Sequence, residues 1–188
     1  HTRLKGARVL VVDDHATSRR VVGEMMAEVG TLVDEVSDAA GALEALRSQI
    51  KTGAPYDLAV IDAYMPGVDG FQLAGTIRDQ PELAATKLMM LTSAGHRGDA
   101  QRCKELGITG YLVKPVAGAE LLEAATAVLE GPGAGQLITR HTIQENRKRL
   151  RILLAEDNRV NQEVAVAMLR LRGHEVDFVD NGGLAVVA

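Results

Sequence analysis

The chain has 188 residues, of which 46% are hydrophobic, and carries a formal net charge of −4. This charge and an aromatic content of 3% argue against a nucleic-acid-binding surface. No apolar run reaches the ~18 residues of a membrane span, and no secretory signal is visible, so we expect a cytoplasmic protein. Its one cysteine, Cys103, excludes an internal disulfide and fits a reducing compartment. The first residue is His1 rather than Met, which indicates a piece of a longer protein whose other parts could anchor it to a membrane.

Five short apolar runs, each bounded by polar or turn-forming residues, are typical of buried strands. They cover residues 9–12, 32–36, 58–62, 88–91 and 111–113. Between and after them, apolar residues recur at helical spacing. These helical patterns cover residues 21–29, 43–50, 71–78, 100–106 and 120–130. Strands that alternate with helices in this way predict an α/β fold with a doubly wound parallel sheet.

Polar side chains stand at the ends of four predicted strands. They are Asp13, Asp14, Asp62, Thr92 and Lys114. In a doubly wound sheet, ligands bind beyond the carboxyl ends of the strands, where these groups would meet. Taken singly, Asp62 could be a turn residue, Thr92 a helix cap and Lys114 a solvated edge residue. Three acids, a hydroxyl and an amine gathered at one edge are the more specific interpretation.

Such a set of side chains indicates phosphoryl-transfer chemistry. Two carboxylates ~4 Å apart repel by about 4 kcal/mol at an effective dielectric of about 20, so the site must protonate an acid or bind a cation. An oxygen-rich site with few fixed ligands suits Mg²⁺. Lys114 and the Thr92 hydroxyl can then stabilise a phosphoryl group. Asp62, already ionised at neutral pH, can accept that group as the nucleophile.

A change of composition separates the first 130 residues from the rest. Residues 131–135 are Gly-rich and predict a flexible linker. The stretch 140–151 is basic, and is either a solvated connector or a docking site for an acidic partner. We therefore divide the chain into a domain at residues 1–130, a linker at 131–149 and part of a second domain at 150–188.

The tail repeats the start of the chain. A shift of 143 positions lays residues 151–157 on residues 8–14 without a gap, so that Glu156 and Asp157 match the first acidic pair. The counterpart of Asp62 would fall beyond residue 188. We therefore expect an incomplete second copy that consists of a strand, a helix, a strand and the start of another helix. Such a fragment exposes apolar edges, so we expect it to pair with another chain or to pack on the first domain.

Residues 8–130 closely resemble the receiver domain of bacterial two-component response regulators. The matching positions are Asp13 and Asp14 for the acidic pair, Asp62 for the phosphoacceptor, Thr92 for the switch hydroxyl, Tyr111 for the switch aromatic and Lys114-Pro115 for the Lys-Pro pair. The spacings of 30 residues from Asp62 to Thr92 and of 22 from Thr92 to Lys114 are those of the family.

The resemblance implies a five-stranded flavodoxin-like sheet of strand order 2-1-3-4-5 and a site for Mg²⁺. Asp14, Asp62 and the backbone carbonyl of Tyr64 would bind the ion, and Asp13 would help through a water molecule.

The resemblance also implies how the module is used. A phosphohistidine on a histidine kinase or a histidine phosphotransfer domain would donate its phosphoryl group to Asp62. Thr92 and Lys114 would hold the phosphoryl oxygens, and movement of Thr92 would let Tyr111 turn inward. The peptide bond between Lys114 and Pro115 would be cis.

Tandem receivers joined by a basic connector resemble the C-terminal part of hybrid sensor histidine kinases. The resemblance implies that the parent protein is such a kinase and that its second receiver is truncated here. No kinase catalytic domain is expected in this chain, although a receiver promotes the phosphorylation and dephosphorylation of its own aspartate.

Two positions depart from the family pattern. Tyr64 is bulky where many receivers carry a smaller or amide side chain, and Ala94 is small and apolar two residues after Thr92. Because no amide or acid there orients an attacking water, and because Tyr64 would shield the site, we expect the phosphoryl group on Asp62 to be long-lived.

Rival functions are less well supported by the residues present. An aspartate-nucleophile phosphatase would require an acid at the position of Tyr64. A degenerate receiver used only for binding would not need the complete set of site residues. A flavodoxin-like nucleotide binder would require a Gly-rich loop after the first strand, and the sequence has none there.

Overall fold

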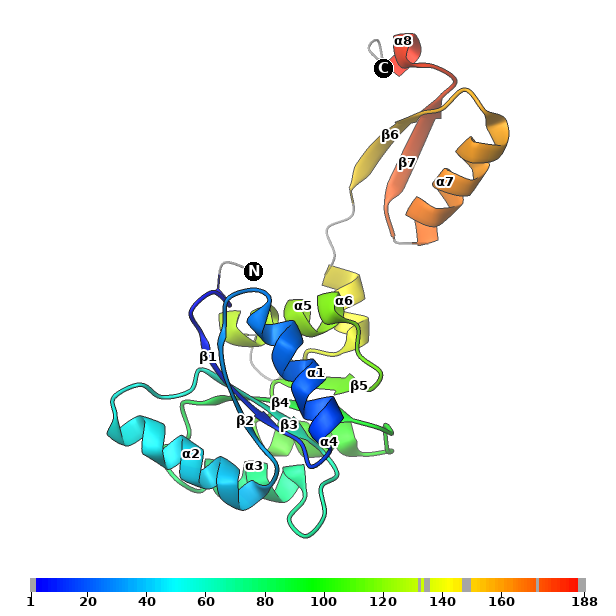
Figure 1. Cartoon of the computed structure of the whole chain (residues 1–188). Coiled ribbons are helices and arrows are strands. Elements are labelled where there is room, and N and C mark those ends of the chain that lie inside the picture. Colours follow the sequence, from blue (N-terminus) through cyan, green and yellow to red (C-terminus); the bar gives the residue numbers. More distant parts are fainter. Residues whose placement is uncertain (1–2, 132, 134–135, 147–149, 172, 186–188) are drawn as a thin grey trace. The chain divides into compact units, whose positions relative to one another are not determined.

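The computed structural model describes residues 3–131, 133, 136–146, 150–171 and 173–185. The chain divides into two compact units, His1–Ile143 and Gln144–Ala188, both visible in Figure 1. None of the helices in the described ranges has the length and apolar character that a membrane crossing requires.

The first unit is built around a five-stranded parallel sheet (Figure 1). Its strands are β1 Arg8–Val12, β2 Leu32–Val36, β3 Leu58–Asp62, β4 Lys87–Thr92 and β5 Gly110–Val113. Their order is β2-β1-β3-β4-β5, which confirms the predicted α/β fold and strand order. The central strand, β3, is buried along its whole length.

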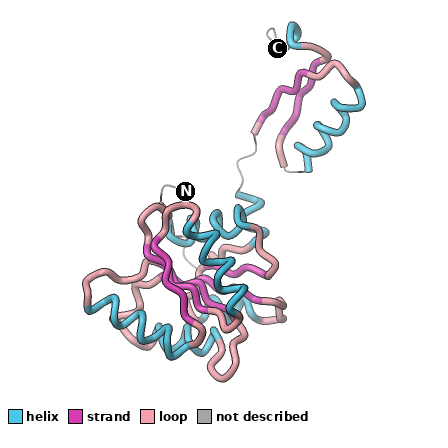
Figure 2. Tube along the Cα trace, viewed as in Figure 1, coloured by secondary structure: helices cyan, strands magenta, loops and turns pink. Residues whose placement is uncertain are grey.

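Helices cover both faces of this sheet (Figure 2). They are α1 Ala16–Ala27, α2 Ala39–Lys51, α3 Gly70–Arg78, α4 Asp99–Glu105 and α5 Gly118–Glu130. Alternate side chains of β1 and β3 point to opposite faces, as strand geometry requires. Val9, Val11, Leu58 and Val60 pack with α1 and α5, whereas Leu10, Val12, Ala59 and Ile61 pack with α2, α3 and α4. Burial on two faces explains why these strands are continuous apolar runs in the sequence.

Short polar signals fix the starts of two helices. Asp38 is the N-cap of α2 and accepts a hydrogen bond from the Gly41 amide at 2.8 Å. Asp69 and Gln72 form a reciprocal capping box at the start of α3, directly after the loop that leaves β3. These caps hold the helices at the carboxyl edge of the sheet.

The segment that we expected to be a linker is partly folded onto the first unit. Ile138 forms a parallel bridge with Gly110 beside β5, and helix α6 follows at Arg140–Asn146. Arg140 pairs with Glu120 of α5 at 2.6 Å. Three apolar side chains of this segment are buried, namely Leu137, Ile138 and Ile143. The sequence did not indicate their burial, because the surrounding residues are glycines and basic residues typical of a linker. The remaining basic residues at 147–149 lie outside the described ranges.

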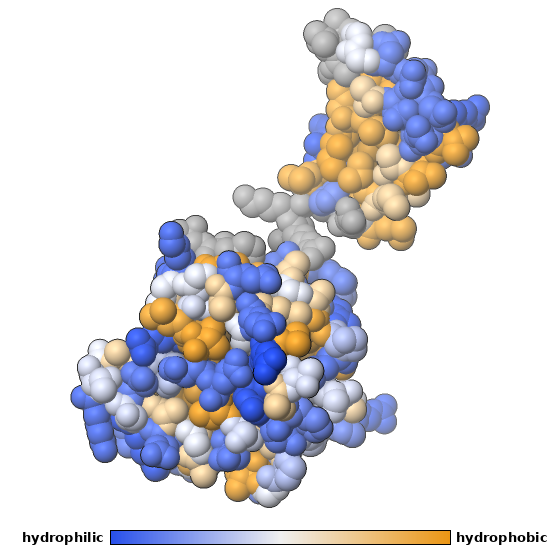
Figure 3. All heavy atoms as spheres, viewed as in Figure 1, coloured by the Kyte–Doolittle hydropathy of each residue, from blue (hydrophilic) through white to orange (hydrophobic). Residues whose placement is uncertain are grey.

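The second unit contains strand β6 Arg151–Ala155, helix α7 Arg159–Leu171, strand β7 Glu175–Val179 and helix α8 Gly182–Ala185. β6 and β7 pair in parallel, so the predicted strand, helix, strand and start of a helix are confirmed. Hydrophobic atoms cover much of the visible face of this smaller unit (Figure 3). Four apolar side chains of α7 are each more than half exposed: Val160, Val164, Met168 and Leu171.

Candidate functional site

The carboxyl ends of β1, β3, β4 and β5 lie side by side at one edge of the first sheet. The strand register shows this, because the last residues of the strands pair with one another or one residue apart: Val12 with Ile61, Asp62 with Leu91 and Thr92 with Val113. The polar residues that end or follow these strands are therefore brought together. Of the five residues expected to converge here, Asp13, Asp62 and Lys114 are in direct contact.

Lys114 joins two carboxylates from distant parts of the chain. Its Nζ lies 2.7 Å from Asp13 Oδ2 and 3.1 Å from Asp62 Oδ1. The side chains of Asp13 and Asp62 are 3% and 10% exposed, and that of Lys114 is 22% exposed. The alternative of a solvated edge lysine is therefore wrong.

Asp13 is held by several donors. Besides Lys114, the Ser18 hydroxyl donates to Oδ2 at 2.6 Å and the His15 amide donates to Oδ1 at 2.8 Å. Burial alone would raise the pKa of Asp13, but these hydrogen bonds outweigh it and lower the pKa. Ser18 was not identified from the sequence, because its contact with Asp13 depends on the rotation of α1.

The pKa of Asp62 is shifted in the opposite direction. Burial raises it, Lys114 partly offsets this increase, and the negative charges of Asp13 and Asp14 raise it further. The pKa of Lys114 is raised, because its contacts with Asp13 and Asp62 outweigh the effect of burial. One ammonium thus does not fully neutralise the acids at this edge, and an additional cation would favour their ionised forms.

The acidic pair has the donor atoms for such a cation. One ligand atom each of Asp13, Asp14 and His15 lie within 4.8 Å of one another. Among the described residues, no donor forms a hydrogen bond with the buried Oδ1 of Asp14, although His15 Nδ1 lies 3.3 Å away. An unsatisfied buried carboxylate oxygen beside further carboxylates fits a hard divalent cation such as Mg²⁺.

Thr92 and Tyr111 are both buried beside this edge. Thr92 is 0% exposed, and its hydroxyl donates to the Ala94 carbonyl at 2.8 Å. The N-cap of the next helix is Gly98, so Thr92 is not a helix cap. Tyr111 is 9% exposed, and its hydroxyl donates to Asp99 Oδ2 at 2.8 Å. The switch aromatic expected from the resemblance therefore points into the interior.

Tyr64, two residues after Asp62, lies over the outer side of this region. It is 38% exposed, and its ring meets those of Phe71 and His96 edge-on, with centroid distances of 6.4 and 5.2 Å. Its hydroxyl donates to Asp99 Oδ1 at 3.3 Å. Asp99 was not identified from the sequence, because its contacts depend on the path of the loop before α4.

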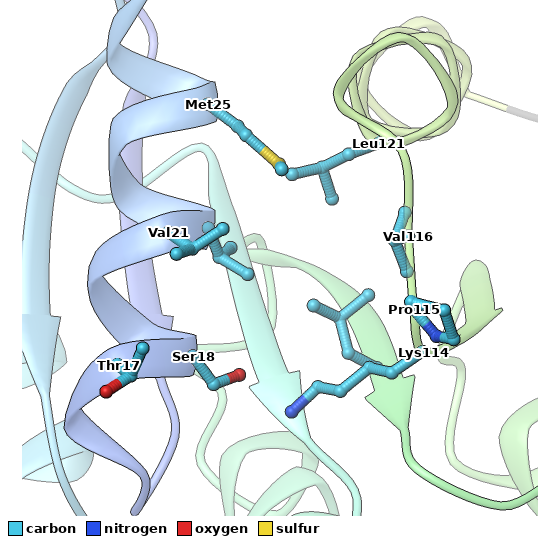
Figure 4. Close-up of a pocket in the computed structure, with 10 residues that line it drawn as sticks. Thr17, Ser18, Val21, Met25, Lys114, Pro115, Val116 and Leu121 are labelled. Carbon is cyan, nitrogen blue, oxygen red and sulfur yellow. The ribbon is translucent and has the colours of Figure 1, made fainter.

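An apolar groove of about 220 Å³ lies next to Lys114, between α1 and the start of α5. In Figure 4, Met25 and Leu121 meet across one end of it, and Lys114 and Ser18 lie at the other end. Val21, which also lines the groove, is 42% exposed. The groove thus leads along apolar side chains to the Lys114 ammonium.

Comparisons with known proteins agree with this arrangement. The family model described as response regulator receiver domain matches residues 9–126. Chemotaxis protein CheY-3 of Vibrio cholerae is 32% identical over 127 residues, which are 67% of this chain and 94% of that protein. The gliding motility regulatory protein of Myxococcus xanthus is 33% identical over 121 residues, which are 64% of this chain and 15% of that larger protein.

Solved structures give the same result. The chemotaxis protein CheY4 of Vibrio cholerae superposes with a TM-score of 0.58 at 32% identity, over 65% of this chain and 98% of its own. A response regulator described as putative from Chloroflexus aurantiacus gives a TM-score of 0.61 at 25% identity, over 67% of this chain and 99% of its own. The matched portion is the first unit with its edge of carboxylates.

Proposed function

Because the chain belongs to the response regulator receiver domain family, we propose that it accepts a phosphoryl group on Asp62 in a two-component phosphorelay. The observation that carries this proposal is the Lys114 ammonium between Asp13 and Asp62, at the end of the central buried strand. A carboxylate that is buried next to a fixed positive charge is suited to accept a phosphoryl group and to hold the product.

In the proposed reaction, a carboxylate oxygen of Asp62 attacks the phosphorus of a phosphohistidine. The new P–O bond forms as the P–N bond breaks, and the electron pair of that bond stays on the imidazole nitrogen. Lys114 neutralises charge on the transferring group, and the Thr92 hydroxyl can turn from the Ala94 carbonyl to a phosphoryl oxygen.

We assign the metal site to Asp14, Asp62 and the backbone carbonyl of Tyr64, with Asp13 acting through water. Bound Mg²⁺ would neutralise the carboxylates and the phosphoryl oxygens. The unsatisfied Oδ1 of Asp14 supports this assignment.

Receiver domains generally interact with histidine kinases or phosphotransfer proteins, and we propose that the donor here docks on the groove beside Lys114. The half-exposed Val21 offers an apolar contact next to the acceptor. Since such donors work in the cytoplasm, we place the module there. The repeated second unit supports an origin in a hybrid histidine kinase with tandem receivers, in which the acids of the second copy are Glu156 and Asp157.

Incubation with acetyl phosphate and Mg²⁺, followed by measurement of the intact mass, tests acceptance of the phosphoryl group. The parent chain should gain one phosphoryl group and Asp62→Asn should gain none. If neither chain gains one, the binding-only receiver is favoured. If free phosphate accumulates rapidly from phosphorylated small molecules, the phosphatase is favoured.

The donor is tested separately with Val21→Glu. This variant should keep its reaction with acetyl phosphate and lose at least about tenfold in the rate of transfer from a phosphorylated histidine phosphotransfer protein. Equal losses with both donors would show that the substitution damages the site rather than the docking surface.

A further inference from the structure

Asp99 is a buried carboxylate that the proposed phosphoryl transfer does not use. It is the first residue of α4 and is 5% exposed. Its Oδ2 accepts hydrogen bonds from the Tyr111 hydroxyl at 2.8 Å and from the His96 amide at 3.0 Å. The Tyr64 hydroxyl donates to its Oδ1 at 3.3 Å. Burial alone would raise the pKa of Asp99, but these donors together lower it, so the carboxylate is ionised and binds them strongly.

The two tyrosines belong to segments whose other ends meet in the acidic site. Tyr64 stands two residues after Asp62, and Tyr111 stands three residues before Lys114. Asp62 and Lys114 are themselves in contact at 3.1 Å. Asp99 therefore links two segments, those of Tyr64 and Tyr111, that are also in contact with each other through Asp62 and Lys114.

Helix α4 is fixed to the same loop by a second set of contacts. The Arg102 guanidinium lies 4.3 Å from the centroid of the Phe71 ring and 3.8 Å from an Asp69 oxygen. Phe71 in turn meets the ring of Tyr64 edge-on. Helix α4 therefore contacts the hydroxyl of Tyr64 through Asp99 and the surroundings of its ring through Arg102 and Phe71.

We propose that Asp99 is a positioning residue that couples Tyr64 to Tyr111. Its carboxylate keeps Tyr64 beside the acidic site and Tyr111 in the interior, so a displacement of either tyrosine changes the position of the other. Two consequences follow: Tyr111 is held inward without a phosphoryl group, and Tyr64 is held where it shields Asp62 from water. The second consequence rests on the proposed function, whereas the first does not.

Fluorine NMR of the unphosphorylated chain labelled with 3-fluorotyrosine tests the coupling, because the chain has 3 tyrosines. Tyr64→Phe should shift the resonance of Tyr111, and Tyr111→Phe should shift that of Tyr64. In an Asp99→Asn background both cross-effects should disappear. Tyr56, whose hydroxyl donates to Asp34 at 2.7 Å, is the internal reference, and Asp34→Asn should move its resonance alone. Cross-effects that are missing from the parent chain, or that persist without the Asp99 carboxylate, would overturn the proposal.

The lifetime of the phosphoryl group gives the functional readout. Asp99→Asn should shorten its half-life by roughly tenfold, the loss expected for one charge-assisted hydrogen bond, while Asp34→Asn should leave it unchanged. Equal half-lives in these two variants would contradict the shielding role. If the parent chain takes up no phosphoryl group, the proposed function fails, and the NMR experiment still decides the coupling.

Discussion

The buried Oδ1 of Asp14 receives no hydrogen bond from any described donor. The negative charges of Asp13 and Asp14 also act on Asp62 and raise its pKa. A cation that binds there only in the folded chain stabilises the fold. We predict that Mg²⁺ at about a hundred times its dissociation constant raises the free energy of unfolding by about 2.7 kcal/mol. Thermal unfolding of the unphosphorylated chain measures this. Asp14→Asn should lose most of the gain, and Asp157→Asn, its counterpart in the second unit, should keep it; an equal gain in both would contradict the metal assignment.

Cys103 is fully buried in α4 and carries a free thiol. Burial, aided by the Asp99 charge, raises its pKa from 9.0 to about 12. The folded chain thus holds the thiol proton more tightly than the unfolded chain. This stabilisation is complete below pH 9 and is lost as the pH rises towards 12.

At pH 8 the thiolate fraction of Cys103 should be about a thousandfold lower in the folded chain than in the unfolded chain. We predict that a disulfide reagent labels it at least about a hundredfold more slowly in buffer than in urea. Labelling rates within about threefold of each other would show that the thiol is accessible and reactive in the folded chain.

At the scale of residues, the sequence was sufficient to predict the position of side chains that stand at the carboxyl end of a strand. Asp62 and Lys114 could be predicted to meet because the carboxyl ends of parallel strands share one edge. Asp99 and Ser18 could not, because their partners depend on the path of a loop and on the rotation of a helix. The inward position of Tyr111 was expected only of the phosphorylated state, and the Asp99 contact explains why it occurs without phosphate.

At the scale of elements, the junction of β3 and α3 determines where Asp62 lies. A Cβ on Gly70, the first residue of α3, would clash with the Asp62 carbonyl oxygen and lie 3.0 Å from Met90 Sδ. Gly75 lies in the same helix, and a Cβ there would meet only an ordinary contact with Leu106 at 3.7 Å.

We predict that Gly70→Ala lowers the free energy of unfolding by about 2–3 kcal/mol, because backbone must move to admit the methyl group. It should also slow phosphoryl uptake, since the displaced backbone carries the acceptor. Gly75→Ala should be neutral or stabilising by up to about 1 kcal/mol, because alanine favours the helix. Urea unfolding compares the two variants; equal stabilities would show that the close approach at Gly70 is not a constraint.

Strands were the elements most readily predicted, because burial on both faces leaves them as apolar runs. Helix α6 and the bridge at Ile138 were missed. Their buried side chains are few and stand in a stretch whose glycines and basic residues are typical of a connector. Their burial depends on packing against other elements of the first unit, which the stretch itself does not reveal.

At the scale of the whole molecule, the duplication gives two copies of one pattern with different surroundings. In the first unit α1 packs beside α5, whereas in the second unit the corresponding helix, α7, exposes an apolar stripe. Val164 of α7 is the counterpart of Val21 of α1. The duplication itself was visible in the sequence, because a constant shift of 143 aligns the two copies.

We predict that the stripe on α7 drives association with a second copy of the chain. The parent chain should sediment as a concentration-dependent dimer, and Val164→Glu should sediment as a monomer. Val21→Glu, the matched substitution in the first unit, should still dimerise. A parent chain that stays monomeric, or a dimer unaffected by Val164→Glu, would contradict this use of the second unit.

The most direct test of the account identifies the residue that carries the phosphoryl group. After phosphorylation with acetyl phosphate and Mg²⁺, borohydride reduces an aspartyl phosphate to homoserine, and peptide mass spectrometry locates it. The account predicts homoserine at residue 62 alone, and its loss when Lys114→Ala removes the ammonium. Homoserine at residue 13, 14 or 157, or none in a chain that has gained phosphate, would contradict it.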